Sequence, residues 1–364
     1  MNADQIIALL NLLHTRGVGP QRVRSLVSHY RDPSVIHKLS YRELCAVEGV
    51  DTKTAQAILE KREKEYGREE WERIQKRKVA IVTFWDPDYP VLLKKIYDPP
   101  VILYTKGQSL KAEEDCVAVV GTRKNTPYGK QVAKNIVREL VQLGITIVSG
   151  LARGIDTLAH RETLNNRGRT IAVLGSGIDV MYPAENRSLA MAIRKEGTIV
   201  SEFEMGANPD AGNFPQRNRI ISGLCQATIV VEAGHHSGAI LTALNAVDQN
   251  REVFAVPGRV TDAKSVGCLR LIRNGAIPLE NASQVLEHIQ HKMFKPPRPQ
   301  QQQLRLDLTR TERKLWDVLG SEPKHIDEIV TESQMGVTQV LATLLGMELK
   351  GAVIQLSGKQ FVRA

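Results

Sequence analysis

The stretch ITIVSGLARGID, residues 145–156, joins an apolar run to a glycine-rich turn and then to the start of a helical pattern. Its run Ile145–Val148 carries no charge, as expected of a strand buried on both faces of a parallel sheet. Two glycines and Arg153 follow directly. The same order of strand, glycine turn and helix recurs along residues 76–291, and it predicts an open, doubly wound parallel α/β sheet.

Short apolar runs of this kind mark the expected strands of the sheet. They are Val79–Phe84, Val101–Tyr104, Cys116–Val120, Ile145–Val148, Thr170–Leu174, Thr198–Ser201, Thr228–Val231 and Val253–Val256. Helical stretches such as Lys130–Gln142 and Ile240–Gln249 separate several of them. Most of the runs are apolar throughout rather than alternating, which favours a sheet that is covered on both faces.

Residues 1–75 read as helical, with two breaks at Gly17-Val18-Gly19-Pro20 and Gly49-Val50-Asp51. Each break is a short glycine turn between helices. Residues 292–308 contain Lys295-Pro296-Pro297-Arg298-Pro299 and four glutamines, a composition that predicts a linker. We therefore expect four segments: a helical domain over 1–75, a core over 76–291, a linker over 292–308 and a closing domain over 309–364.

The closing domain shows three helical stretches and a strand pair. The helices are expected over Glu312–Leu319, His325–Val330 and Val337–Leu349, and the strands lie around Ser357-Gly358-Lys359. Three helices followed by a hairpin predict a winged helix-turn-helix.

The chain has 364 residues and a net charge of +9. Residues 76–291 hold 26 lysines and arginines against 21 acids, whereas residues 304–364 hold eight of each. An anionic partner is expected, and it is expected at the core and the linker rather than at the closing domain.

The four cysteines are far apart, so neither a zinc site nor a disulfide framework is expected. No signal peptide and no apolar run long enough to span a membrane is present, and we expect a cytoplasmic protein without membrane insertion.

Two glycine turns of the core carry arginines. Val119-Val120-Gly121-Thr122-Arg123 follows an expected strand and leads toward a helix, so it is either a phosphate-binding turn or a tight turn with a solvated arginine. Ser149–Asp156 repeats the design with Arg153. Asp156 reads as a helix N-cap rather than as a catalytic acid. The Walker loop GxxxxGK[ST] is absent, which disfavours an ATPase.

Three further turns complete the pattern. Leu174-Gly175-Ser176-Gly177 lacks the last glycine of a dinucleotide signature but permits close approach of a phosphate. Asn213–Leu224 places Phe214 beside Arg217, Asn218 and Arg219, and it reads either as a phosphate and base contact or as a helix start with solvated arginines. Glu232–Ala239 ends in Ser237, which either caps a helix or binds phosphate, and its paired histidines are expected to lie in a solvated loop.

Because the carboxyl ends of parallel strands share one edge of a sheet, we expect these turns to meet in one crevice. Four arginines are expected to line it: Arg123, Arg153, Arg217 and Arg219. Such a crevice suits a strand of phosphates better than a single nucleotide.

These motifs resemble the bacterial DNA-processing family DprA, also called Smf. The motifs are Val119–Arg123, Ser149–Asp156, Phe214–Gly223 and Glu232–Ala239. The resemblance implies an extended Rossmann-like core that binds single-stranded DNA, with a helix-hairpin-helix, SAM-like domain before it and a winged helix after it. It implies DNA contacts for Gly121, Thr122, Arg123, Ser149, Gly150, Arg153, Gly175, Ser176, Gly177, Phe214, Arg217, Asn218 and Arg219.

The resemblance also implies a homodimer formed through the core and the loading of RecA recombinase onto incoming DNA during natural transformation. It implies no catalytic residue, no cofactor and no metal, and a winged helix that contacts duplex DNA or a partner. One alternative stays open. Related Rossmann proteins are nucleotide-processing enzymes that release the base from nucleoside monophosphates, and Glu232 beside Gly234 and Gly238 fits their glycine turn with an acidic residue.

Overall fold

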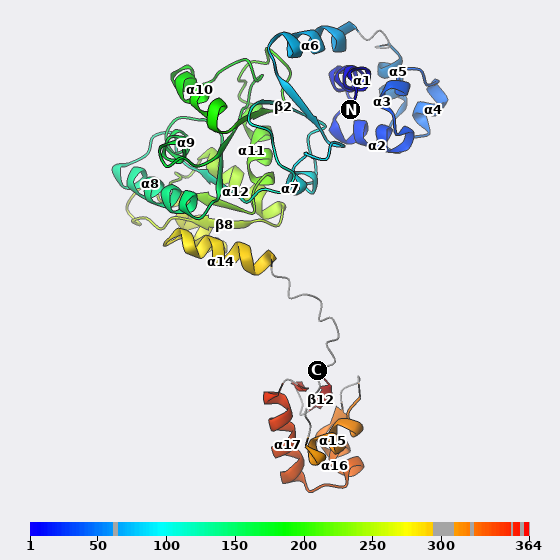
Figure 1. Cartoon of the computed structure of the whole chain (residues 1–364), viewed down its shortest axis with the longest axis vertical. Helices are drawn as coiled ribbons and strands as arrows, with labels where there is room; N and C mark the ends of the chain where they lie inside the picture. Colours follow the sequence, from blue (N-terminus) through cyan, green and yellow to red (C-terminus); the bar gives the residue numbers. More distant parts are fainter. Residues whose placement is uncertain (61–64, 294–308, 321–323, 351, 357–359, 364) are drawn as a thin grey trace. The chain divides into compact units, whose positions relative to one another are not determined.

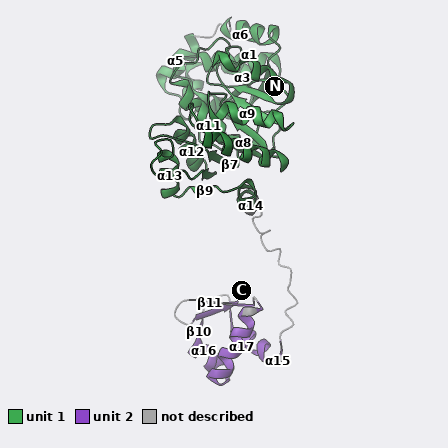
Figure 2. Cartoon of the chain, turned by 90° about the vertical axis from the view of Figure 1, so that its left-hand side faces the viewer, with its two compact units in different colours: residues 1–293 green, residues 294–364 purple. Residues whose placement is uncertain are grey.

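The protein is described from a computed structural model that covers residues 1–60, 65–293, 309–320, 324–350, 352–356 and 360–363. The chain forms two compact units, Met1–Met293 and Phe294–Ala364 (Figure 2). Of the predicted linker, residues 294–308 lie outside the described residues, whereas residues 292 and 293 end a helix of the first unit.

The first unit begins with short helices around an apolar cluster. They are α1 (Ala3–His14), α2 (Pro20–Tyr30), α3 (Pro33–Ile36), α4 (Tyr41–Cys45), α5 (Thr52–Glu60) and α6 (Glu65–Lys76). Two glycines with positive φ, Gly17 and Gly49, form the predicted turns, and Arg22 donates to the carbonyl oxygens of both. Because one arginine joins the two turns, these helices pack as a single body.

A nine-stranded sheet forms the centre of the unit, in the order β1-β2-β6-β5-β4-β3-β7-β8-β9. Its strands are β1 (Ala80–Thr83), β2 (Ile102–Gly107), β3 (Cys116–Val120), β4 (Thr146–Ser149), β5 (Thr170–Val173), β6 (Thr198–Ser201), β7 (Ala227–Val230), β8 (Glu252–Ala255) and β9 (Ile277–Pro278). The strands from β6 to β9 are parallel, as predicted. The first two are not: β1 pairs antiparallel with β2, and β2 pairs antiparallel with β6.

Helices cover both faces of this sheet (Figure 1). They are α7 (Val91–Lys94), α8 (Pro127–Gln142), α9 (Ile155–Asn165), α10 (Arg187–Glu196), α11 (Asn213–Gly223), α12 (Gly238–Asp248), α13 (Val266–Arg273) and α14 (Ala282–Met293). Apolar side chains of α8, α9 and α14 pack on one face, and those of α7, α11, α12 and α13 pack on the other. The central strands are buried along their whole length, which confirms the expectation drawn from their uniform apolar character.

The strand order reverses between β3 and β7, because β4 to β6 extend to one side of β3 and β7 to β9 extend to the other. In open α/β sheets, ligands bind outside the carboxyl ends of the strands at such a reversal. The fold therefore directs attention to the turns after β3 and β7.

The N-terminal helices are tied to the core by polar contacts. The buried Glu70 of α6 accepts hydrogen bonds from the Tyr104 hydroxyl at 3.2 Å and from the Met205 backbone N–H at 2.7 Å. The Arg24 guanidinium of α2 donates to the Pro99 carbonyl oxygen at 2.6 Å. The contacts cross residue 75, where we predicted a domain boundary, so the helices and the sheet belong to one unit.

The second unit contains α15 (Arg310–Val318), β10 (Lys324–His325), α16 (Ile326–Ser333), α17 (Val337–Leu349), β11 (Val353–Leu356) and β12 (Gln360–Arg363). It has its own apolar core around Leu315, Ile329 and Leu344. Three helices and a three-stranded sheet confirm the predicted winged helix, although the turn at residues 357–359 lies outside the described residues. Among the described residues, no helix is long and apolar enough to cross a membrane.

Candidate nucleic-acid interface

The glycine turns meet at the carboxyl edge of the sheet and enclose two hollows. A hollow of about 560 Å³ is lined by the turns after β3 and β7, and a tight one of about 20 Å³ is lined by the turns after β4 and β5. Arg123, Ala152, Phe214 and Arg217 line both hollows and so form the partition between them. All five predicted turns therefore contribute to one crevice, at the reversal of strand order.

The turn after β3 is held by the acid after β7. The backbone N–H of Thr122 donates to the Glu232 carbonyl oxygen at 2.8 Å. The Glu232 carboxylate, which is buried, accepts from the backbone N–H of Thr126 at 2.9 Å and from its hydroxyl. Thr126 is the N-cap of α8. The single acid that favoured an enzyme is thus engaged in fixing the position of the turn that carries Arg123.

The turn after β4 requires a glycine at one position. Gly154 has a φ of +77°, and a Cβ there would lie 2.2 Å from the Thr122 carbonyl oxygen. Gly154 is also the N-cap of α9, so the prediction that Asp156 is the N-cap is wrong. Asp156 instead lies one residue inside the helix, where its carboxylate accepts from the Gly150 N–H at 3.1 Å and the Ala152 N–H at 3.4 Å. The Asp156 carboxylate thus holds the turn of residues 150–152 against the first turn of α9.

Arg217 is a buried cation at the base of the crevice, with 4% of its surface exposed. Its guanidinium donates to the carbonyl oxygens of Gly150 and Val173 and to the Asn218 side chain. Burial lowers its pKa to about 10, with Arg123 acting in the same direction and Asp156 opposing. At neutral pH the group therefore stays charged, and it both supports the second turn and makes the crevice positive.

Arg123 and Arg153 are the exposed cations of the crevice. The Arg123 guanidinium lies over the Phe214 ring, 5.5 Å from its centroid. Arg153 forms an ion pair of 2.8 Å with Glu185, in which both side chains are more than half exposed. An incoming phosphate would meet Arg123 directly, whereas it would have to displace Glu185 from Arg153.

An aromatic pair lines the tight hollow. Phe214 and Tyr182 lie with ring centroids 5.8 Å apart and tilted, and Tyr182 is 42% exposed. The Phe214 ring packs on Gly175, where a Cβ would lie 2.9 Å from the ring edge. The sequence analysis did not identify Tyr182 and Pro183, because it followed the glycine turn only as far as Gly177. An aromatic residue shortly after a glycine turn was the available signal.

The two predicted serines use their hydroxyls inside the protein. Ser149 donates to the Val119 carbonyl oxygen at 2.7 Å, and Ser176 donates to the Val180 carbonyl oxygen at 2.8 Å. Gly177 lines neither hollow and packs instead against the backbone of residues 204–207. The serines shape the turns, whereas Thr122 lines the larger hollow and its hydroxyl accepts from the Lys124 N–H at 3.3 Å.

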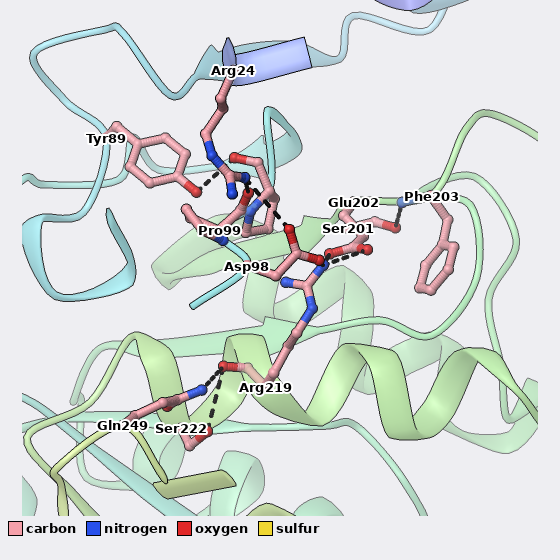
Figure 3. Close-up of polar contacts among 11 residues, drawn as sticks. Arg24, Tyr89, Asp98, Pro99, Ser201, Glu202, Phe203, Arg219, Ser222 and Gln249 are labelled. Atoms are coloured by element: carbon pink, nitrogen blue, oxygen red, sulfur yellow. Dashed lines mark hydrogen bonds and ion pairs between the residues drawn. The ribbon is translucent and has the colours of Figure 1, made fainter. Parts of the chain in front are cut away.

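Arg219 lines neither hollow, and its side chain points toward Glu202 and Asp98 (Figure 3). It follows Arg217 by two positions on α11, so the helix turns its side chain toward the opposite side. Its guanidinium donates to both oxygens of the Glu202 carboxylate at 2.6 and 2.9 Å, and it lies 3.9 Å from Asp98, which also contacts Arg24. The expected convergence of four arginines thus holds for three of them.

Four other residues in or near the turns, three histidines and a serine, differ in their surroundings. His160 is fully buried and donates from Nδ1 to the Thr170 hydroxyl, which itself donates to the Ile147 carbonyl oxygen. Burial, with Arg217 adding to it, lowers the pKa of His160 to about 3, so the ring is neutral. Ser237 is the N-cap of α12, as one of its two expected roles requires, and it also lines the larger hollow. His235 and His236 are exposed at the rim of the larger hollow.

Comparison with known proteins follows the same division of the chain. The model of the family described as DNA recombination-mediator protein A matches residues 80–290. The Smf protein of Synechocystis sp. is 36% identical over 390 residues, which cover 96% of each chain. The chain belongs to the DprA/Smf family.

The flanking segments match family models as well. Residues 9–64 match a SAM-like helix-hairpin-helix tandem, and residues 295–359 match the DprA winged helix domain. The Smf protein of Escherichia coli is 36% identical over 279 residues, or 74% of each chain.

Two solved structures of DprA proteins resemble the structure. DprA from Streptococcus pneumoniae superposes with a TM-score of 0.68 at 32% identity and covers 79% of this chain and 98% of its own. DprA from Helicobacter pylori, whose structure is described as showing a single-stranded-DNA binding mode, gives a TM-score of 0.53 at 30% identity over 58% of this chain and 96% of its own.

Proposed function

We propose that this DprA/Smf protein binds single-stranded DNA in the crevice at the carboxyl edge of its sheet. One observation carries the proposal: Arg123 is an exposed cation without a carboxylate partner among the described residues, and it lies where four glycine turns and the first turns of α11 meet. The structure of the H. pylori relative, which concerns a single-stranded-DNA binding mode, supports the same ligand class.

The geometry assigns different tasks to the crevice residues. Arg123 contacts a phosphate, since a guanidinium forms paired hydrogen bonds with phosphate oxygens. Phe214 and Tyr182 offer faces on which a base stacks, a contact that every base can make. Gly121 and Gly150 let the backbone approach the strand, and Arg217 supplies charge from below. Binding of this kind is tolerant of sequence.

The proposal includes a non-enzymatic role in the cytoplasm. Glu232 is occupied by Thr126, so the acid needed for base release from a nucleotide has another task. We therefore favour protection of incoming single strands and loading of RecA recombinase onto them during natural transformation and recombination. The family description, a DNA recombination mediator, supports this role.

A homodimer through the core is part of the proposal. Three apolar residues of α12 are exposed at helical spacing: Leu241 (46%), Leu244 (49%) and Val247 (57%). Such a stripe on a folded core is typical of a subunit interface. Val247→Glu should convert the dimer to a monomer in sedimentation velocity, and an unchanged sedimentation coefficient would place the interface elsewhere.

The winged helix contributes less to this proposal. Helix α17, in the position of a recognition helix, contains no lysine or arginine, and its Val337, Leu341 and Leu345 side chains are exposed. Duplex DNA is bound mainly through cations that contact phosphates. Of the two roles that the resemblance implies, the surface of α17 favours a partner over duplex DNA.

Titration with a fluorescent oligothymidine tests the crevice. Arg123→Ala should weaken binding about tenfold and reduce the salt dependence by about 0.7 in the slope of log K against log salt. Arg138→Ala, on the surface of α8, is the matched control and should bind like the parent. Equal affinity of Arg123→Ala and Arg138→Ala would remove the crevice from the DNA path. Arg217→Ala is a poorer probe because it also leaves the Gly150 and Val173 carbonyl oxygens unpaired.

A filament-loading assay tests the cellular role. Single-stranded DNA is coated with its binding protein, RecA and ATP are added, and strand exchange is followed with and without this chain. We expect RecA filaments to form faster with the parent protein than without it. With Arg123→Ala, the rate should equal that measured without the protein. Release of free base from nucleoside monophosphates by the parent would instead favour an enzyme.

A further inference from the structure

A second basic surface lies beside the crevice, where α6, β2 and α10 meet. The chain leaves α6 through Lys76, Arg77 and Lys78 and enters β1 at Ala80. The antiparallel register pairs Ala80 with Thr105, so Lys106 lies beside the residues that follow α6. Three elements that are distant in sequence thus bring cations together at one place.

The third element is α10. Gly107 packs directly on its last turn, and a Cβ at Gly107 would lie 3.2 Å from the Cα of Arg194. Arg194 is exposed, and Lys106 is partly buried. Figure 1 shows α10 and β2 on the same side of the core, below α6. We call Arg77, Lys106 and Arg194 the α6–α10 basic surface.

One carboxylate opposes these three cations. Asp179 lies 3.7 Å from the Arg77 guanidinium with one oxygen, and its other oxygen accepts from the Gly206 N–H at 2.8 Å. Asp179 therefore holds Arg77 in place. Neither Lys106 nor Arg194 forms an ion pair with a carboxylate among the described residues. Two of the three cations thus lack a direct ion pair, although the Asp179 carboxylate also acts on Lys106.

The neighbouring charges act on Lys106. Its pKa is lowered by burial first, then by Arg194, and also by Arg77, while Asp179 opposes the change. Arg194 taken alone has another explanation, because a cation in the last turn of a helix stabilises the helix dipole. Lys106 lies on a strand and gains nothing from such a dipole. A partly buried lysine among like charges costs stability, and a bound anion would remove that cost.

The surface continues the path of the crevice. Asp179 belongs to the glycine turn after β5, and it follows Ser176, which lines the tight hollow, by three residues. Three residues span about 10 Å at most. Arg77, which contacts Asp179, is therefore the end of the α6–α10 basic surface nearest to the hollow, whereas Lys106 and Arg194 lie toward the amino end of β6, where Lys106 pairs with Ile199. A strand that leaves the hollow along this turn meets Arg77 first and the other two cations after it, and this order favours a nucleic-acid backbone over an acidic protein segment.

We propose that the α6–α10 basic surface is a second single-stranded-DNA contact, which binds the phosphates of the strand where it leaves the crevice. The proposal rests on the proposed function of the crevice. It predicts a dependence on length: a strand that only fills the crevice does not reach Lys106 and Arg194, whereas a longer one does.

The test compares two oligothymidines, one of about six and one of about 20 nucleotides, within the range of known single-strand site sizes and above it. The variant is Lys106→Gln with Arg194→Gln, which spares Arg77 and its pair with Asp179. The matched control is Lys95→Gln with Lys111→Gln, which removes the same charge at the hollow beside Cys116, where both lysines are exposed. Affinity and salt slope are measured for the full chain with each strand.

We expect the variant to bind the long strand about tenfold more weakly than the control does, with a salt slope reduced by about 1.4, or 0.7 for each lost phosphate contact. Its affinity for the short strand should equal that of the control. Equal affinities and slopes for the long strand would overturn the proposal while leaving the crevice intact. If the variant loses binding of a fluorescent polyglutamate peptide but not of the long strand, an acidic protein is the ligand. If the parent binds neither strand, the proposed function fails as well.

Discussion

The two edges of the central sheet are both hollowed, yet they differ in how their charges are used. At the carboxyl edge, glycine turns surround Arg123, which has no carboxylate partner among the described residues. At the amino edge, a hollow of about 600 Å³ lies beside Cys116, and two of its carboxylates are engaged by neighbouring side chains. Glu114 accepts from Arg169 at 2.5 Å, and Asp115 accepts from Gln226 at 2.9 Å.

The size of a hollow therefore does not identify a site for a polyanion. The hollows at the two edges are of similar size, and the amino edge also carries exposed cations, Lys95 and Lys111. The carboxyl edge combines an exposed guanidinium with aromatic faces and with backbone that can be approached closely. This combination, rather than volume or charge alone, distinguishes the edge at which we propose DNA binding.

The largest effect should come from Gly154, which shapes the carboxyl edge. Gly154→Ala should lower the free energy of unfolding by about 3 kcal/mol, since its Cβ meets the Thr122 carbonyl oxygen and its φ is positive. Gly144→Ala has a similar φ of +79° in open space and should cost about 1 kcal/mol. Urea denaturation measures both. Equal costs would show that the contact with Thr122 does not require glycine there.

Arg169 and Arg123 should separate stability from binding. Arg169 donates to Glu114, to the Gln108 side chain, to the Ser109 carbonyl oxygen and to Thr198. Arg169→Ala should cost about 2 kcal/mol of stability, because a partly buried carboxylate loses its partner, and should leave oligothymidine affinity unchanged. Arg123→Ala should instead weaken oligothymidine binding and leave the free energy of unfolding unchanged. A loss of affinity in Arg169→Ala, measured below its unfolding temperature, would contradict the division between the edges.

A buried histidine gives the carboxyl edge its own dependence on pH. The pKa of His160 is about 3 in the folded state, below the usual 6.5, so the unfolded state binds more protons between these values. The contribution of neutral His160 to the free energy of unfolding is complete above pH 6.5. It is lost as the pH falls below that value, at up to about 1.4 kcal/mol per pH unit. His160→Gln should flatten the fall in stability between pH 6.5 and pH 4 relative to the parent. Parallel profiles would mean that His160 is already solvated.

The smallest effect concerns the exposed pair of Arg153 and Glu185. Exposed pairs contribute little to stability, so Glu185→Gln should leave the unfolding midpoint unchanged. It should raise the affinity for oligothymidine up to about threefold, because a phosphate no longer competes with a carboxylate for Arg153. Glu113→Gln, an exposed acid at the amino edge, is the control for net charge. If both variants gain equally, the effect is long-range and not local to Arg153.

Much of the fold could be predicted because the central strands are apolar on both faces. The runs Cys116–Val120 and Thr198–Ser201 were predicted with their observed bounds. The two-residue strand β9 was missed, since Ile277 and Pro278 are too short a run to give a pattern. The antiparallel pairing of β1 and β2 was also missed, because direction depends on the connection between strands and not on their composition.

The crevice was predictable in position but not in every side chain. Glycine turns after buried strands located the edge correctly. The error about Arg219 has a simple cause: residues 213–224 had two interpretations, and on the observed helix Phe214 and Arg217 share a face that Arg219 does not. The roles of Glu232 and Asp156 depend on partners brought close by the fold, such as Thr126, and no local pattern reveals them.

The buried Glu70 has a practical consequence for dividing or recombining this chain. A fragment that starts after α6 would leave the Tyr104 hydroxyl and the Met205 N–H without their shared acceptor, in a region that is buried in the whole chain. The C-terminal unit, with its own core, is the natural module to exchange with a relative. The N-terminal helices and the sheet are better inherited together, so a chimaera should keep both from the same parent.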